Sequence, residues 1–93
     1  MKISVVIPTW ERAEVLEIVL NALIDQTVEK DSFEVIVCDS HSSDTTAQVI
    51  ESFKGDLAIK LVHSEVNAPG IKRNRGAEEA DGDILVFLDD DVV

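Results

Sequence analysis

Residues 3–7, Ile3-Ser4-Val5-Val6-Ile7, form an apolar and largely β-branched run that ends at Pro8. Three further runs of this kind follow, at residues 34–38, 57–62 and 84–88. Runs that are mostly apolar, rather than strictly alternating, are typical of strands covered on both faces, as in a parallel sheet. The sequence therefore predicts four short parallel strands.

The segments between these runs have helical character. Apolar residues recur at spacings of three and four in two of them: Ala13, Leu16, Leu20 and Leu23 in the first, and Ala47, Ile50 and Phe53 in the second, which is expected to begin near residues 42–44. A third helix, opened by Pro69, has few apolar residues on any face and contains Gly76, which lowers helix propensity. The alternation predicts an α/β fold with a Rossmann-like open parallel sheet and helices on both faces.

The length, net charge and cysteine content of the chain exclude several classes of protein. With 93 residues the chain forms one domain at most. A net charge of −11 argues against a nucleic-acid partner, because such binding depends on basic residues that meet phosphates. The single Cys38 excludes an internal disulfide, and no apolar run is long enough to span a membrane. Cytoplasmic residence is the default expectation, with peripheral attachment at the inner face of the membrane as an option.

Polar side chains gather directly after the predicted strands, whereas plain turn residues precede them. The segments that follow the strands are Pro8-Thr9-Trp10-Glu11, Asp39-Ser40-His41-Ser42, His63-Ser64-Glu65 and Asp89-Asp90-Asp91. All loops that follow parallel strands lie at the same edge of the sheet, where open α/β folds bind ligands. The sequence therefore predicts a ligand site at the carboxyl edge.

Several of these residues allow two interpretations. The adjacent carboxylates 89–91 suit a hard cation such as Mg2+ or Mn2+, or form a solvated strand end. Asp39 can accept hydrogen bonds from a base or ribose, or cap the next helix. Trp10 can stack on a base or pack against the next helix. Three of the eight basic residues, Lys72, Arg73 and Arg75, lie within four positions. This cluster indicates a phosphate clamp or a solvated helix face.

Four segments together resemble family 2 glycosyltransferases of the GT-A fold. Residues 4–12 are similar to S-V-x-I-P-T-Y-N-R, and residues 33–45 to F-E-V-I-V-V-D-D-G-S-T-D-x-T. Residues 70–76 are similar to the region written G-x-x-x-A-R-N-x-G, and residues 82–91 resemble G-D-x-I-x-F-L-D-x-D. The motifs occur in order and span the whole chain, so residues 1–93 resemble the nucleotide-sugar-binding part of the catalytic domain, truncated after the D-x-D motif.

The resemblance implies a strand order of 3-2-1-4, a nucleotide-diphosphate-sugar donor and a divalent metal, Mg2+ or Mn2+. It also implies site residues. The base pocket would be lined by Pro8, Thr9 and Glu11, with Asp39 holding the base. Arg73 would reach the diphosphate, while Asp89 and Asp90 would contact the donor, and Asp91 and Asp89 the metal. Ser40 and His41 replace the usual second Asp and Gly, which leaves the identity of the base open.

The resemblance places the acceptor site and the catalytic base beyond this chain. No catalytic residue is therefore expected within it, and the acceptor (a glycan, lipid or protein) is unspecified. A non-catalytic nucleotide-binding or interaction module is an alternative. A receiver-type signalling domain fits less well. It needs acidic residues after the first strand and an aspartate after the third, and residues 9–11 and 63–65 do not supply that set. The apolar fourth strand, expected at an edge of the sheet, predicts self-association.

Overall fold

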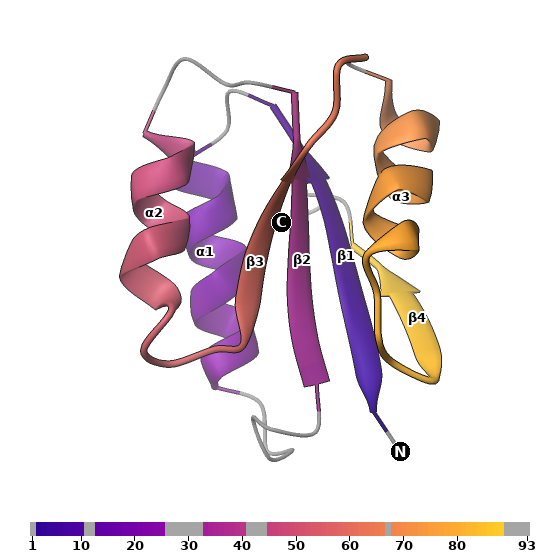
Figure 1. The fold of residues 1–93 in the computed structure, drawn as a ribbon. Coiled ribbons are helices and arrows are strands. Elements are labelled where there is room, and N and C mark those ends of the chain that lie inside the picture. Colours follow the sequence, from indigo (N-terminus) through magenta and orange to yellow (C-terminus); the bar gives the residue numbers. More distant parts are fainter. Residues whose placement is uncertain (1, 11–12, 26–32, 41–44, 67, 89–93) are drawn as a thin grey trace.

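The computed structural model describes residues 2–10, 13–25, 33–40, 45–66 and 68–88. Seven elements alternate along the chain, as Figure 1 shows: β1 (Ile3–Thr9), α1 (Ala13–Ile24), β2 (Phe33–Asp39), α2 (Thr46–Phe53), β3 (Ile59–His63), α3 (Pro69–Glu78) and β4 (Ile84–Phe87). In the described part of the chain the strands form one sheet in the order β3-β2-β1-β4. All three pairings are parallel, so the predicted topology is confirmed.

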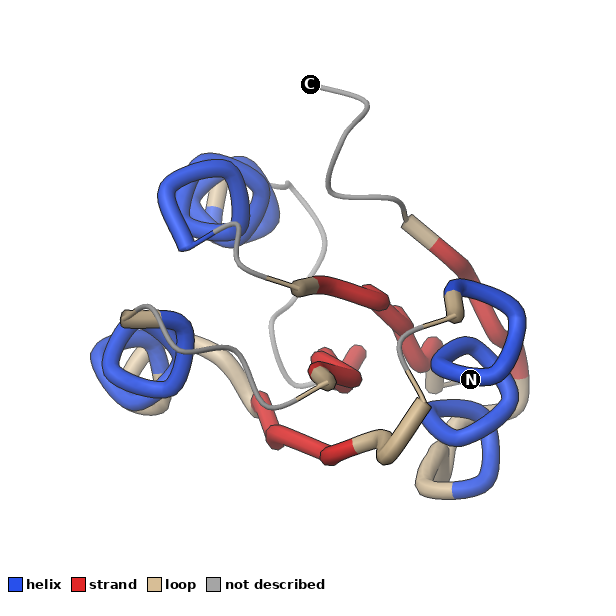
Figure 2. The backbone as a smooth tube through the Cα atoms, turned by 90° about the horizontal axis from the view of Figure 1, so that it is seen from above, coloured by secondary structure: helices blue, strands red, loops and turns tan. Residues whose placement is uncertain are grey.

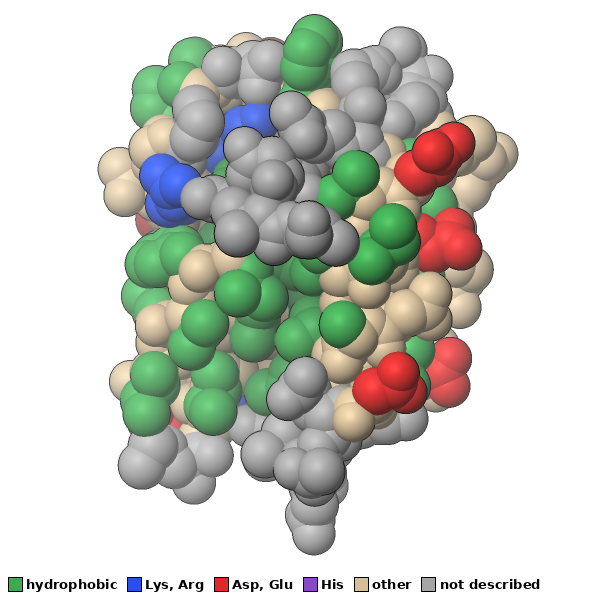
Figure 3. Space-filling model, turned by 180° about the vertical axis from the view of Figure 1, so that it is seen from behind, with side chains coloured by type: hydrophobic (Ala, Val, Ile, Leu, Met, Phe, Trp, Pro, Cys, Tyr) green, Lys and Arg blue, Asp and Glu red, His purple; other side chains and the backbone are tan. Residues whose placement is uncertain are grey.

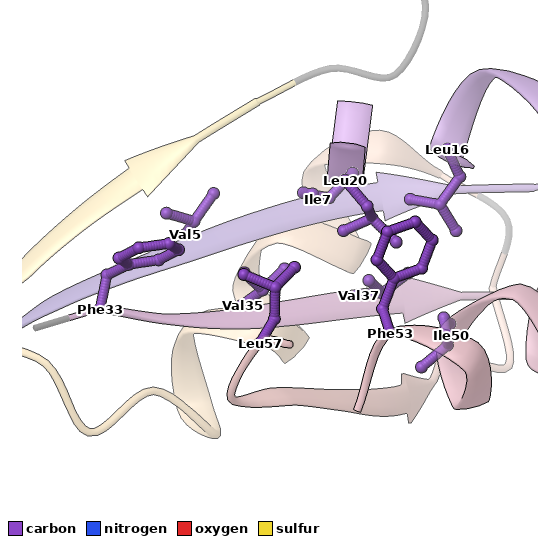
Figure 4. Packing of buried hydrophobic residues seen from close by; sticks show 10 residues of the cluster. All are labelled: Val5, Ile7, Leu16, Leu20, Phe33, Val35, Val37, Ile50, Phe53 and Leu57. Atoms are coloured by element: carbon purple, nitrogen blue, oxygen red, sulfur yellow. The ribbon is translucent and has the colours of Figure 1, made fainter. Parts of the chain in front are cut away.

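The sheet lies between two layers of helix. Helices α1 and α2 cover one face and α3 covers the other, as Figures 1 and 2 show. Successive side chains of a strand point to opposite faces, and the core divides accordingly. Toward α3 lie Val6, Ile36, Cys38 and Val62. The larger cluster, drawn in Figure 4, consists of Val5, Ile7, Leu16, Leu20, Phe33, Val35, Val37, Ile50, Phe53 and Leu57.

The first predicted helical stripe is confirmed, and the second is partly wrong. Leu16 and Leu20 are fully buried on α1. On α2, Ala47 is exposed and Thr46 is buried instead. The buried positions of α2 are 46, 50 and 53. Thr46 and Ala47 both lie at helical spacing from Ile50, and the packing of α2 buries Thr46. The expected helix start at residues 42–44 lies outside the described residues.

Two strand boundaries also differ from the predicted runs. Leu57 precedes β3, because its N–H donates to the carbonyl of Phe53 at 2.9 Å and continues the turn that ends α2. Leu57 is nevertheless 4% exposed and belongs to the core. Its apolar character is the reason that the sequence pattern included it in the predicted strand. β4 ends at Phe87, although the Leu88 N–H still donates to the Val6 carbonyl at 3.0 Å.

Helix α3 packs closely on β1 because Gly76 has no side chain. A Cβ atom at position 76 would lie 2.5 Å from Cγ1 of Val6, a separation that packed carbon atoms do not tolerate. The glycine that weakened the helix prediction is therefore the residue that lets this helix approach the sheet.

A buried carboxylate organises the opposite, amino edge of the sheet. The Ser4 hydroxyl and the Asp81 N–H donate to Oε2 of Glu34 at 2.6 and 2.7 Å. The Gly82 N–H donates to Oγ of Ser4 at 2.8 Å. Burial alone raises the pKa of Glu34, but these two bonds to the carboxylate and the charges of Lys60 and Lys2 outweigh it and lower that pKa. The turn before β4 is thus tied to β1 and β2, and this edge carries more than plain turn residues.

Within the described ranges, no helix is both long enough and apolar enough to pass through a bilayer.

Candidate functional site

The carboxyl edge brings the ends of β1 and β2 together. Thr9 and Asp39 are partners in the parallel register and are the last residues of their strands. They are 2% and 3% exposed. Pro8 is also buried and pairs with Cys38. Sequence positions that the resemblance assigned to one pocket are therefore neighbours in the fold.

Two serines hold the loop after β3 against the end of β2. The Ser64 N–H donates to the carbonyl of Asp39 at 2.8 Å. The hydroxyls of Ser40 and Ser64 both donate to the carbonyl of Val66, at 3.2 and 2.8 Å. An ionised aspartate at position 40 could not donate such a bond. The structure thus assigns a loop-holding role to Ser40, which the sequence marked only as a departure from the family pattern.

The three basic residues of α3 have different environments. Lys72 is 4% exposed, and its Nζ donates to the carbonyl of Thr9 at 3.1 Å. Arg75 pairs with Glu79 one turn along the helix, at 2.9 Å between Nη1 and Oε1. Arg73 is partly exposed. The three residues therefore do not form one phosphate clamp, because Arg75 lies on a solvated helix face and Lys72 is buried against β1.

Exposed apolar side chains border the same edge. Trp10, directly after β1, keeps 48% of its surface exposed. Val66 in the loop after β3 and Ile71 in the first turn of α3 are 50% and 47% exposed. Because nearly half of its surface is exposed, Trp10 offers an apolar surface at this edge.

The expected metal ligands lie outside the described residues, as does Glu11. Asp89, Asp90 and Asp91 follow Leu88, the last residue that the structure describes. Among the described residues no group of three His, Cys, Asp or Glu side chains could hold a metal ion. Of the residues predicted for the site, the structure thus places Pro8, Thr9, Asp39 and Arg73.

Residues 4–93 match a family described as glycosyl transferase family 2. The chain is 37% identical over 93 residues to the Staphylococcus aureus poly(ribitol-phosphate) beta-N-acetylglucosaminyltransferase TarS, with 98% of this chain and 16% of that protein covered. It is 42% identical to validoxylamine A glucosyltransferase from Streptomyces hygroscopicus, over 98% of this chain and 22% of that protein. The chain thus spans less than a quarter of the length of these two curated relatives.

Solved structures agree with these matches. The fold superposes on S. aureus TarS in complex with UDP-GlcNAc with a TM-score of 0.91 and 36% identity, covering 98% of this chain and 27% of that one. The mannosyltransferase PcManGT from Pyrobaculum calidifontis, in complex with GDP-Man and Mn2+, gives a TM-score of 0.87 and 31% identity, covering 97% and 27% of the two chains.

Proposed function

The chain belongs to glycosyl transferase family 2, and on that premise we propose that it binds a nucleotide-diphosphate sugar at the carboxyl edge of its sheet. One observation carries the proposal. The paired strand ends at Thr9 and Asp39 form a buried polar pair at the edge where open α/β sheets bind ligands. Relatives of similar fold contain UDP-GlcNAc or GDP-Man, which supports a donor of this chemical class.

The proposed roles combine the family resemblance with the positions that the structure describes. Pro8, Thr9 and Glu11 line the base pocket, Asp39 accepts hydrogen bonds from the base, and Trp10 covers one face of it. Arg73, in the middle of α3 and partly exposed, neutralises charge on the diphosphate. Ser40 supports this pocket indirectly, by fixing the loop at residues 64–66.

Metal dependence is a further part of the proposal. Asp89 and Asp90 would contact the donor, and Asp91 with Asp89 would hold Mg2+ or Mn2+. Such an ion would offset the charge that develops on the departing diphosphate. The Mn2+ in the PcManGT complex supports this expectation for a relative of 31% identity.

Sugar transfer needs an acceptor hydroxyl and a base that removes its proton. The chain spans less than a quarter of its two curated relatives, and no residue described here is assigned as that base. We therefore propose that these 93 residues bind the donor and do not transfer the sugar alone. The acceptor would be a glycan, lipid or protein. Cytoplasmic residence, with peripheral contact to the inner face of the membrane as an option, agrees with the buried free thiol of Cys38.

A nucleotide titration tests the donor site, with the single tryptophan as the reporter. We expect UDP, GDP or dTDP to quench Trp10 fluorescence, and Mn2+ to tighten that binding on the order of tenfold, which corresponds to about 1.4 kcal/mol. Asp91→Ala should abolish the gain from Mn2+. Asp56→Ala, in an exposed turn at the amino edge, is the matched control. Equal metal dependence in the wild type and Asp91→Ala would remove Asp91 from the metal site.

Self-association through β4 is the second part of the proposal. Among the described residues β4 pairs only with β1. Its four side chains Ile84, Leu85, Val86 and Phe87 are 38–45% exposed. Figure 3 shows hydrophobic side chains gathered on this side of the molecule. An apolar edge strand of this kind favours pairing with another chain, here a second copy.

Light scattering over a range of protein concentrations tests this pairing. The average mass should rise with concentration, and rise further with added salt, because a net charge of −11 repels like copies until it is screened. Leu85→Lys should keep the chain monomeric. The control is Ile18→Lys, which places the same charge at another exposed apolar position, 54% exposed on α1. A wild-type chain that stays monomeric at high concentration contradicts the proposal.

A further inference from the structure

Lys72 is a buried ammonium group at the ligand edge. Its surface is 4% exposed. This burial is notable because a basic side chain in a chain of net charge −11 could instead remain in contact with water. Burial of an ammonium group is costly unless hydrogen bonds replace its water. Its Nζ donates to the carbonyl of Thr9, at the end of β1, at 3.1 Å. The lysine therefore joins the first turn of α3 directly to the end of the first strand.

Helix α3 is held on β1 at two separate points. Near its carboxyl end, Gly76 lies against Val6 with no space for a Cβ atom. Near its amino end, Lys72 reaches the Thr9 carbonyl, and the Lys72 N–H donates to the Ala68 carbonyl at 2.9 Å. Because two successive turns of the helix contact one strand, the Lys72 ammonium has a defined position relative to the turn that begins at Thr9.

The charge of Lys72 also acts on β2. Burial raises the pKa of the Cys38 thiol, and the positive charges of Arg75 and Lys72 oppose that rise. Cys38 precedes Asp39 on β2, so the Lys72 charge lies close to the ends of both β1 and β2. The proposed base pocket lies at these two strand ends.

We propose that Lys72 is a positioning residue for the base-binding end of the donor site, and that it acts by holding the Thr9 carbonyl and the turn that carries Trp10. The inference rests on the proposed donor site. It assigns Lys72 a role different from a phosphate clamp, because its Nζ donates to the carbonyl of Thr9 at the end of β1.

The two roles predict different patterns of affinity. A positioning residue acts on the base, so its loss weakens uridine and UDP by the same factor. A phosphate clamp acts only where phosphate is present, so its loss weakens UDP alone. The mobility of Trp10 without any ligand separates the inference from the proposed function, since Trp10 directly follows Thr9.

The experiment compares Lys72→Met with Lys54→Met, which removes the charge of a half-exposed lysine after α2. Both variants are measured well below their melting temperatures. For Lys72→Met we expect lower fluorescence anisotropy of Trp10 without ligand, and losses of about five- to tenfold in affinity for both uridine and UDP. Lys72→Arg, which keeps donors and charge, should recover most of the affinity. Lys54→Met should behave as the wild type.

A loss confined to UDP overturns the inference and identifies a phosphate contact. Unchanged anisotropy and unchanged affinities also overturn it. If the wild type binds neither uridine nor UDP, the proposed function fails for a uracil donor, and the ligand-free anisotropy still decides whether Lys72 holds the turn. If Lys72→Met does not fold, Lys72→Gln, which keeps one polar donor group, supplies the same comparison.

Discussion

Asp39→Ala is expected to weaken nucleotide binding by about 10- to 100-fold, with or without Mn2+. Asp39 ends β2 with 3% of its surface exposed, so a hydrogen bond from a base to its carboxylate would be shielded from water. Hydrogen bonds to charged groups contribute about 1.5–3 kcal/mol, which sets the expected range. Isothermal titration calorimetry with the preferred nucleoside diphosphate measures the loss directly.

Two variants show whether this loss comes from the carboxylate itself. Asp39→Asn keeps the shape and one acceptor oxygen, so it should bind more tightly than Asp39→Ala and more weakly than the wild type. Asp56→Ala removes an exposed carboxylate before β3 and should leave affinity unchanged. If Asp39→Ala bound nucleotide as the wild type does, the carboxylate would have no part in donor recognition.

Gly76→Ala should lower the free energy of unfolding by about 1–2 kcal/mol, although alanine favours helix by about 1 kcal/mol over glycine. The added Cβ atom would lie 2.5 Å from Cγ1 of Val6, which is fully buried and β-branched and so has no free rotamer to move into. Either α3 or β1 must shift. The same shift would carry Lys72 away from Thr9, so nucleotide affinity should fall as well. Urea denaturation followed by circular dichroism gives the free energy.

Gly70→Ala on the same helix is the matched control. A Cβ atom at position 70 would meet nothing within 4 Å, so this variant should be neutral or more stable by up to about 1 kcal/mol. A double-mutant cycle then tests the contact, because Val6→Ala removes the atom that a Cβ at position 76 would meet. In that background Gly76→Ala should cost much less. An equal cost in both backgrounds would show that the Val6 contact is not the cause.

Local patterns predicted most of the fold. The four apolar runs became four parallel strands, and the spacing of Leu16 and Leu20 marked the buried stripe of α1. These features depend on neighbours within a few residues, since strand and helix each impose a short period on the chain. The pattern was less reliable at ends of elements. Thr46 rather than Ala47 faces the core, because both positions fit the helical spacing and the packing of α2 decides between them.

The local pattern also predicted a ligand site at one edge of the sheet, because all loops that follow parallel strands lie at that edge. The family resemblance assigned Thr9 and Asp39 to one pocket, and the parallel register makes them neighbours.

The contacts that hold that edge could not be predicted from local patterns. The Lys72–Thr9 bond joins residues 63 positions apart, and the bond between Ser40 and Val66 joins residues 26 apart. The contact of Gly76 with Val6 and the Glu34 network at the amino edge depend equally on distant segments. No local period reports such contacts, because they arise from how closely one helix docks on a sheet. The roles of the buried Lys72 and of Gly76 can therefore be recognised only in the folded structure.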